Sequence, residues 1–247
     1  MAQPRNITLG LLSPATPNKP HFKHVEALLP PGVSLIHEGL GLLGEAYQDL
    51  AGKADVVIGK ATDFVARNKV DGLVLTGGFI GLFNPGIDIR VGDAINLPVA
   101  TAVSSAVAAL NIYKAKSVLL MTPFDAKSDA VIKDYLSGLG FTVYLGPAFE
   151  GRKAGSGVDL SADELFELVG KTYQSYGAAD AIYFQGATMD PLPIIQRLEN
   201  QLKIPVIASN PAMFWNVLSK LGVKDSVKGY GRLLDDWPAQ TQLRRER

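Results

Sequence analysis

Asp71-Gly-Leu-Val-Leu-Thr-Gly-Gly78 and Asp180-Ala-Ile-Tyr-Phe-Gln-Gly-Ala187 lie about 109 residues apart and share one pattern. Each begins with aspartate, continues as a short apolar run and ends in a glycine turn, as buried parallel strands do. A second pair, Leu97-Pro-Val-Ala-Thr-Ala102 and Ile204-Pro-Val-Ile-Ala-Ser209, has nearly the same spacing. The two pairs indicate an internal duplication; the alternative is the general similarity of all α/β sequences.

The repeated stretches belong to two sets of four expected strands. Short β-branched runs alternate with longer helix-periodic stretches, which is typical of parallel strands joined by crossover helices. The first set is expected at 7–12, 33–38, 72–75 and 99–103, and the second at 117–121, 141–145, 181–184 and 206–209. We therefore predict an α/β fold with a first half at 1–115 plus 210–234, whose last segment packs across. The second half is predicted at 116–209 and a tail at 235–247.

The composition of the chain limits the classes of partner that it is expected to bind. The 247 residues contain 24 Lys plus Arg and 24 Asp plus Glu, so no net charge draws the chain to nucleic acid or to a membrane surface. No apolar run approaches the ~18 residues of a membrane span, and the start lacks a signal-peptide pattern. We expect a cytoplasmic protein with a small-molecule partner. The sequence leaves open whether the chain forms a homo-oligomer.

The chain has no cysteine. This excludes disulfides, thiolate metal sites and every cysteine nucleophile or proton carrier. The pair His21 and His24 has no third ligand nearby, so no metal site is expected. Any chemistry must therefore use oxygen and nitrogen.

The two glycine turns are the expected binding site. Ligands of open parallel sheets bind beyond the carboxyl ends of the strands, where the backbone can approach closely. Thr76-Gly77-Gly78 and Gln185-Gly186-Ala187-Thr188 are such ends, and Ser209 with Asn210 follows the last strand. If the halves face each other, free amide groups converge in one cleft, which suits a carboxylate. Plain N-capping is the alternative role for Asn210.

Several motifs resemble the aspartate/glutamate racemase superfamily, within it the arylmalonate decarboxylase and maleate cis–trans isomerase branch. They are Ser209-Asn-Pro-Ala-Met-Phe-Trp-Asn-Val-Leu-Ser219, Gly229-Tyr-Gly-Arg-Leu-Leu234, Gly39-Leu-Gly-Leu42 and the duplicated turns, and the resemblance spans about 7–234. It implies two flavodoxin-like halves related by a pseudo-twofold, in three α/β/α layers. It also implies a carboxylate clamped by backbone amides and hydroxyls, with no cofactor.

The resemblance also indicates which site residues of the family this chain lacks. The family's cysteine positions correspond here to Gly77 and Gly186, so cysteine-dependent racemisation or isomerisation is excluded. The decarboxylase's Thr-Ser pair corresponds to Gly78 and Phe79, and its tyrosine to Phe124. The expected clamp is therefore mostly backbone. Pro14 and Leu40 complete the expected substrate contacts, and Leu40, Phe79 and Phe124 make an apolar cleft or fill a site that has lost its role.

A proton donor must replace the thiol. His37 and Glu38 end the second strand and are the first candidates, although a surface or capping role is the alternative. Thr76 and Thr188 flank the turns, where they would bind a carboxylate or position a water, or bond only to the turn backbone. Three further candidates are Asp125, Lys127 and Asp190.

Three functions follow from these residues. The leading one is a cofactor-independent, decarboxylase-like lyase that stabilises an enediolate with backbone amides. The second is a hydratase or hydrolase whose water, activated by His37 or Glu38, fills the volume that the cysteines vacate. The third is a non-catalytic carboxylate-binding protein.

The loop Gly151-Arg-Lys-Ala-Gly-Ser-Gly157 is too rich in glycine for a regular element and lacks the ending of a phosphate loop. We predict a mobile lid there.

Overall fold

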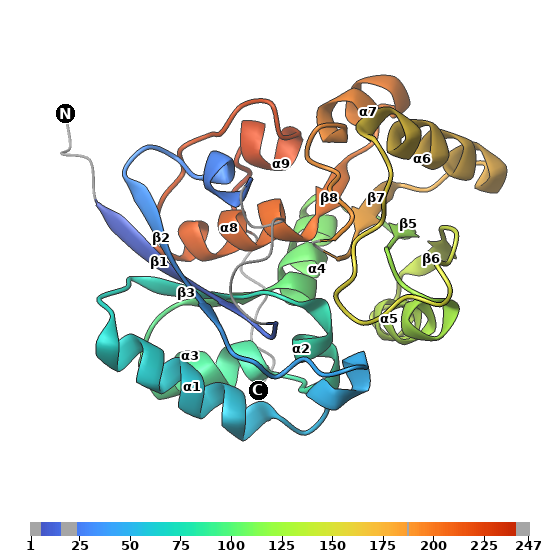
Figure 1. Cartoon of the computed structure of the whole chain (residues 1–247). Coiled ribbons are helices and arrows are strands. Elements are labelled where there is room, and N and C mark those ends of the chain that lie inside the picture. Colours follow the sequence, from blue (N-terminus) through green and yellow to red (C-terminus); the bar gives the residue numbers. More distant parts are fainter. Residues whose placement is uncertain (1–5, 16–23, 187, 241–247) are drawn as a thin grey trace.

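The computed structural model describes residues 6–15, 24–186 and 188–240, as two four-stranded parallel sheets flanked by helices (Figure 1). The first sheet has the order β2-β1-β3-β4, and its strands are β1 Ile7–Ser13, β2 Val33–Gly39, β3 Gly72–Leu75 and β4 Val99–Thr101. The second has the order β6-β5-β7-β8, and its strands are β5 Ser117–Met121, β6 Thr142–Leu145, β7 Ala181–Phe184 and β8 Val206–Ala208. The predicted two-half α/β fold is confirmed.

The helices of the first half are η2 Val25–Leu28, η3 Tyr47–Leu50, α1 Ala54–Arg67, α2 Gly78–Phe83, α3 Ile87–Ile95 and α4 Ala102–Ile112. Those that follow are α5 Ala126–Gly138, α6 Ala162–Tyr176, α7 Ile195–Leu202, α8 Ser209–Lys220 and α9 Arg232–Asp235. Both β4 and β8 end earlier than expected, because α4 and α8 begin directly at the next residue.

The repeated aspartates fix the strand register in each half. The backbone N–H of Thr8 donates to Asp71 Oδ2 at 2.8 Å, and the N–H groups of Lys116 and Ser117 donate to Asp180 Oδ2 at 2.7 and 2.8 Å. The two bonds to Asp180 hold the pKa of its carboxyl below the usual range. In both halves this aspartate therefore anchors the first strand to the third, which explains why the pattern recurs.

Helices α4 and α8 lie between the two sheets (Figure 1). Although α8 follows the second sheet in the chain, it packs on β3 and β4 of the first. A Cβ at Gly72 would lie 3.0 Å from Val217 Cγ2, so glycine at this strand position lets α8 approach closely. At the centre, Asn216 Nδ2 donates to the buried hydroxyl of Ser105 at 2.9 Å. These contacts hold the two halves in one arrangement.

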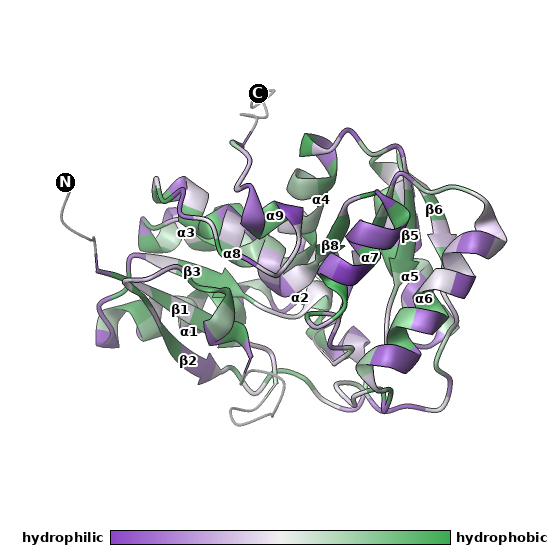
Figure 2. Ribbon diagram, turned by 90° about the horizontal axis from the view of Figure 1, so that it is seen from above, coloured by the Kyte–Doolittle hydropathy of each residue, from purple (hydrophilic) through white to green (hydrophobic). Residues whose placement is uncertain are grey.

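The central strands β3 and β7 are buried along their whole length, as parallel strands covered on both faces require. Figure 2 shows hydrophobic central strands and hydrophilic outer faces on helices such as α6 and α7. After α9 the chain packs on α8, where Trp237 is buried and its Nε1 donates to Ser219 Oγ at 3.0 Å. In the described part of the chain, no helix is long and apolar enough to cross a membrane.

Candidate active site

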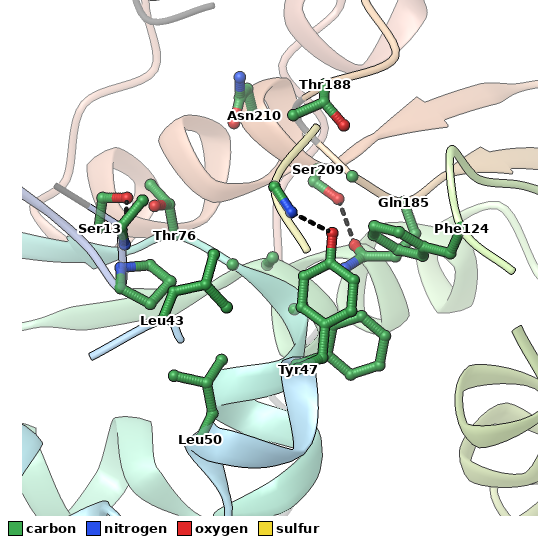
Figure 3. A pocket seen from close by; sticks show the side chains of 18 of the residues that line it. Ser13, Leu43, Tyr47, Leu50, Thr76, Phe124, Gln185, Thr188, Ser209 and Asn210 are labelled. Atoms are coloured by element: carbon green, nitrogen blue, oxygen red, sulfur yellow. Dashed lines mark hydrogen bonds between the residues drawn. The ribbon is translucent and has the colours of Figure 1, made fainter. Parts of the chain in front are cut away.

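The carboxyl ends of strands from both halves meet at one cavity of about 80 Å³ (Figure 3). Residues at or after the ends of all four strands of the first half line it, as do residues after all four strands of the second half. The lining residues are Ser13, Pro14, Ala15, Leu43, Tyr47, Leu50, Thr76, Gly77, Gly78, Phe79, Ala102, Phe124, Gly155, Gln185, Gly186, Thr188, Ser209, Asn210 and Met213. The two glycine turns therefore face a common cleft.

Among these lining residues no side chain is charged. An anion bound here must be held by neutral donors, and several are free to act. The backbone N–H groups of Gly77, Gly78 and Gly186 donate to no other described residue. The hydroxyl oxygen of Thr188 is buried and also lacks a partner among the residues described. Because unpaired buried polar groups are costly, such a set favours an acceptor ligand.

The side chain of Gln185 is the most fixed of these donors. Its Oε1 accepts hydrogen bonds from the hydroxyls of Tyr183 and Ser209, each at 2.6 Å. Both lone-pair directions of the oxygen are then occupied, so the amide nitrogen points the other way. Gln185 is only 1% exposed, yet its Nε2 has no partner in the described structure. The side chain thus offers two N–H donors to the cavity.

Gly78 is the reason that this amide fits. A Cβ at Gly78 would lie 1.7 Å from Gln185 Nε2, so any side chain there would displace the amide. The tip of a second-half residue therefore packs against the backbone of the first-half turn, and the donors from both halves converge.

Gly77 and Gly186, the two positions where the resemblance implied a missing cysteine, leave no room for a side chain. Gly77 has φ +83° and Gly186 has φ +117°, a region that L-residues rarely adopt. A Cβ at Gly77 would lie 2.7 Å from Pro14 Cγ, and one at Gly186 would lie 2.7 Å from Pro123 Cδ. The prediction that the missing cysteines leave free volume is therefore wrong, because a proline ring fills the space beside each glycine.

Aromatic rings form an apolar wall of the cavity. The ring of Tyr47 stacks on Phe79 with centroids 4.3 Å apart and meets the edge of Phe124 at 5.0 Å. The backbone N–H of Gly155 donates to Tyr47 Oη at 2.9 Å, and burial raises the pKa of this phenol. Gly155 lies in the loop 151–157, so the predicted lid does border the cavity; its mobility stays a prediction.

A buried acid supports the turn that carries Phe124. The hydroxyl of Thr122 donates to Asp129 Oδ1 and accepts from the backbone N–H of Phe124 at 3.1 Å. Burial is the main cause that raises the pKa of Asp129 to about 6. This carboxyl lies behind the wall and does not line the cavity.

Most of the predicted contact residues come together here. The cavity is lined by Pro14, Thr76, Gly77, Gly78, Phe79, Phe124, Gln185, Gly186, Thr188 and Asn210. Ala187 and His21 lie outside the described residues. In the part that is described, no group of three His, Asp or Glu side chains is placed to hold a metal ion.

The predicted proton donors do not reach the cavity. His37 is exposed on the edge strand β2, and Glu38 forms an ion pair with Arg67 at 3.0 Å. Asp125 caps α5 by accepting from the N–H of Ser128, while Lys127 and Asp190 also lie outside the lining set.

Leu40 is buried but is not a lining residue, since the N–H groups of Leu42 and Leu43 both donate to Pro14 O and bring Leu43 inward. Sequence reasoning named Gly155 only as part of the lid loop, and it missed the lining residues Ser13, Ala15, Leu43, Tyr47, Leu50, Ala102 and Met213. No local signal marks Tyr47, whose partner Gly155 is 108 residues away.

The fold and this cavity define a class of two-half α/β proteins with a cavity at the carboxyl ends of the strands of both sheets. The model of the arylmalonate decarboxylase family matches residues 9–234, and the chain belongs to that family. The arylmalonate decarboxylase of Bordetella bronchiseptica is 25% identical over 250 residues, covering 96% of this chain and 100% of that protein. The predicted resemblance is confirmed.

Solved structures agree on the fold. A crystal structure of arylmalonate decarboxylase has a TM-score of 0.78 at 21% identity, covering 93% of this chain and 99% of that one. The maleate isomerase Iso from Pseudomonas putida S16 also has a TM-score of 0.78, at 20% identity, covering 94% of this chain and 99% of that one. A maleate cis–trans isomerase variant from Nocardia farcinica, with a covalently bound succinylcysteine intermediate, has a TM-score of 0.78 at 20% identity, covering 93% and 98%. These relatives are enzymes.

Proposed function

We propose that the protein is a cofactor-independent carbon–carbon lyase that decarboxylates a small carboxylic acid with an aryl or alkyl substituent. One observation carries the proposal: unpartnered N–H donors from both halves line the same cavity as a cluster of aromatic rings, with no charged side chain among the lining residues. The donors can hold a carboxylate that stays, and the rings can contact an apolar group.

The decarboxylation would use both the donors and the aromatic rings. Loss of carbon dioxide breaks a carbon–carbon bond and leaves an electron pair on the α-carbon, which delocalises into the remaining carboxylate as an enediolate. Donors already aimed at that oxygen stabilise it in the transition state by about 3 kcal/mol each. A leaving carboxylate against Phe79 and Phe124 has lost its hydration, which favours its departure as neutral carbon dioxide.

The other candidates have less support. The isomerase variant named above carries a succinylcysteine, and this chain has no thiol to form one. A hydratase needs a base for its water, and His37 and Glu38 lie away from the cavity. A protein that only binds a carboxylate would use the same donors, so the experiment must separate binding from turnover.

The test measures carbon dioxide release from phenylmalonate, methylphenylmalonate, methylmalonate and maleate. We expect release from the aryl malonates above the uncatalysed rate, with one deuterium incorporated from D₂O. The Gly78→Ala variant should lose at least about 100-fold in rate, because the new methyl group displaces the Gln185 amide. Gly81→Ala in the same helix is the matched control, since its Cβ would meet nothing closer than 3.7 Å.

Two results would reject the lyase. A thermal shift with the aryl malonates but no turnover would indicate a binding protein. Conversion of maleate to fumarate without carbon dioxide release would indicate an isomerase.

A further inference from the structure

The proposed decarboxylation leaves an α-carbon that must take up a proton, and the cavity restricts where that proton comes from. The protic side chains that line it are the hydroxyls of Ser13, Thr76, Thr188 and Ser209, the amides of Gln185 and Asn210, and the phenol of Tyr47. Of these only the phenol ionises in the ordinary range of protein side chains. Within the lining set, Tyr47 is therefore the strongest acid.

The position of the phenol fits a proton donor. Tyr47 begins η3 in the first half, and its ring is held by Phe79 and Phe124 on the apolar wall. Figure 3 shows the phenol oxygen directed towards the end of the cavity where Gln185 and Ser209 lie. The oxygen accepts a hydrogen bond from the N–H of Gly155, while no described residue accepts the phenol's own hydrogen. That hydrogen is left for a ligand.

We propose that Tyr47 donates the proton that completes the reaction, in place of the missing thiol. The inference rests on the proposed lyase function. The Oη–H bond of Tyr47 breaks and a C–H bond forms at the α-carbon, so the enediolate becomes a carboxylate and the phenol becomes a phenolate. Water at the cavity mouth returns the proton to the phenolate, and the hydroxide left over combines with the released carbon dioxide as bicarbonate.

The surroundings support this role before and after the transfer. Burial raises the pKa of Tyr47 and the charge of Asp125 adds to it, so the phenol carries its proton at neutral pH. When the phenolate forms, the N–H of Gly155 becomes a hydrogen bond to a charged acceptor, which is stronger than one to a neutral acceptor. The charged residues near the outer side of the ring are Glu45, Asp125, Lys127, Arg152 and Lys153.

The lid loop, residues 151–157, holds the phenol of Tyr47 in position from across the cleft. Gly155 belongs to the second half and Tyr47 to the first, and Lys153 pairs with Glu45 at 3.3 Å beside this contact. A proton donor fixed on one side of the cavity delivers its proton to one face of the α-carbon. The product of a prochiral substrate should therefore be a single enantiomer.

The experiment uses the full-length protein with methylphenylmalonate and measures carbon dioxide release together with the enantiomeric excess of the product. The Tyr47→Phe variant should lose about 100-fold or more in turnover, the usual contribution of a general acid. Its residual product should be close to racemic, because water then protonates both faces. Tyr173→Phe is the matched control, since that hydroxyl bonds to Ala179 O away from the cavity.

A second variant separates acid catalysis from packing. Replacing Tyr47 by 3-fluorotyrosine keeps the ring and the oxygen but makes the phenol more acidic. The high-pH limb of the kcat/KM profile, where the phenol has lost its proton, should move to lower pH with the acidity of the phenol. A residue that only packs would not move this limb.

The outcomes are distinct. If wild-type protein releases no carbon dioxide from any substrate of the panel, the lyase function fails and the role of Tyr47 with it. If wild-type protein is active, either an unchanged enantiomeric excess in Tyr47→Phe or an unmoved limb with 3-fluorotyrosine overturns the role of Tyr47 alone.

Discussion

A side chain at Gly77, the first of the two positions where the superfamily resemblance implied a missing cysteine, should destabilise this protein. Gly77 has φ +83°, and a Cβ there would lie 2.7 Å from Pro14 Cγ and 3.0 Å from Cδ. Gly222 matches Gly77 in φ but not in its surroundings, because its φ is +79° and nothing lies within 4 Å of its Cβ position. Comparing Gly77→Ala with Gly222→Ala therefore separates steric crowding from backbone strain.

The magnitudes follow from the two terms. An alanine in the left-handed region costs roughly 1–2 kcal/mol, and this applies to both variants. Crowding in a packed region adds about 1–3 kcal/mol, and this applies to Gly77→Ala alone. We expect the free energy of unfolding to fall by about 2–5 kcal/mol in Gly77→Ala and by about 1–2 kcal/mol in Gly222→Ala. The proline ring is fixed by the backbone at both ends, so it has little room to move away.

Urea denaturation measures both variants, with equal m-values as the check that unfolding stays two-state. Pro14→Ala removes the ring atoms that the new methyl group would meet, so Gly77→Ala should cost less in a Pro14→Ala background. Two results would refute the reasoning. One is a difference between the two alanine variants below about 0.5 kcal/mol, the scale of ordinary surface substitutions. The other is a cost at Gly77 that is independent of Pro14.

Two further predictions concern the buried acid and the amide donor. Burial raises the pKa of Asp129 to about 6 in the fold, against an ordinary value of 3.8, so the folded protein keeps this proton to higher pH and its stability falls as pH rises from about 4 to 6. This pH-dependent part of the free energy of unfolding is roughly 3 kcal/mol, and Asp129→Asn should remove it. Urea denaturation of the two proteins from about pH 4 to 7 measures the difference. Parallel plots of stability against pH would contradict the prediction. Gln185→Glu keeps an oxygen for Tyr183 and Ser209 but replaces the N–H donors by a carboxylate oxygen, so kcat/KM for methylphenylmalonate should fall by about 100-fold or more. Retained kcat/KM in a variant with unchanged Tm would show that the amide does not hold the substrate.

The strands were predictable because their signals are local. Apolar runs that end in glycine mark β3 and β7, and the repeat shows that the two halves share one topology. The turns were predictable as a site for the same reason, since parallel strands bring their carboxyl ends to one edge. The identities of the pocket donors were therefore largely available from the pattern.

The failures concern contacts between distant residues. His37 and Glu38 do stand at a strand end, but β2 is an edge strand, and the chain that follows it reaches the cavity only from Leu43 onward. Leu43 replaces Leu40 because the chain turns over Pro14 O, a bond that the spacing does not reveal. The space beside the glycines is filled by prolines in two other turns, which composition alone cannot show.

The duplication explains how a symmetric scaffold forms an asymmetric site. Thr76 and Gln185 occupy equivalent positions, since their backbone N–H groups donate to Leu12 O and Met121 O, each at 2.9 Å, at the end of the first strand of their halves. The short threonine stays in its own half, whereas the glutamine crosses the cleft and packs against Gly78. The cavity therefore receives donors from both halves next to the aromatic rings. A substrate that contacts both would be oriented relative to Tyr47, as a proton donor requires in order to act on one face of the substrate.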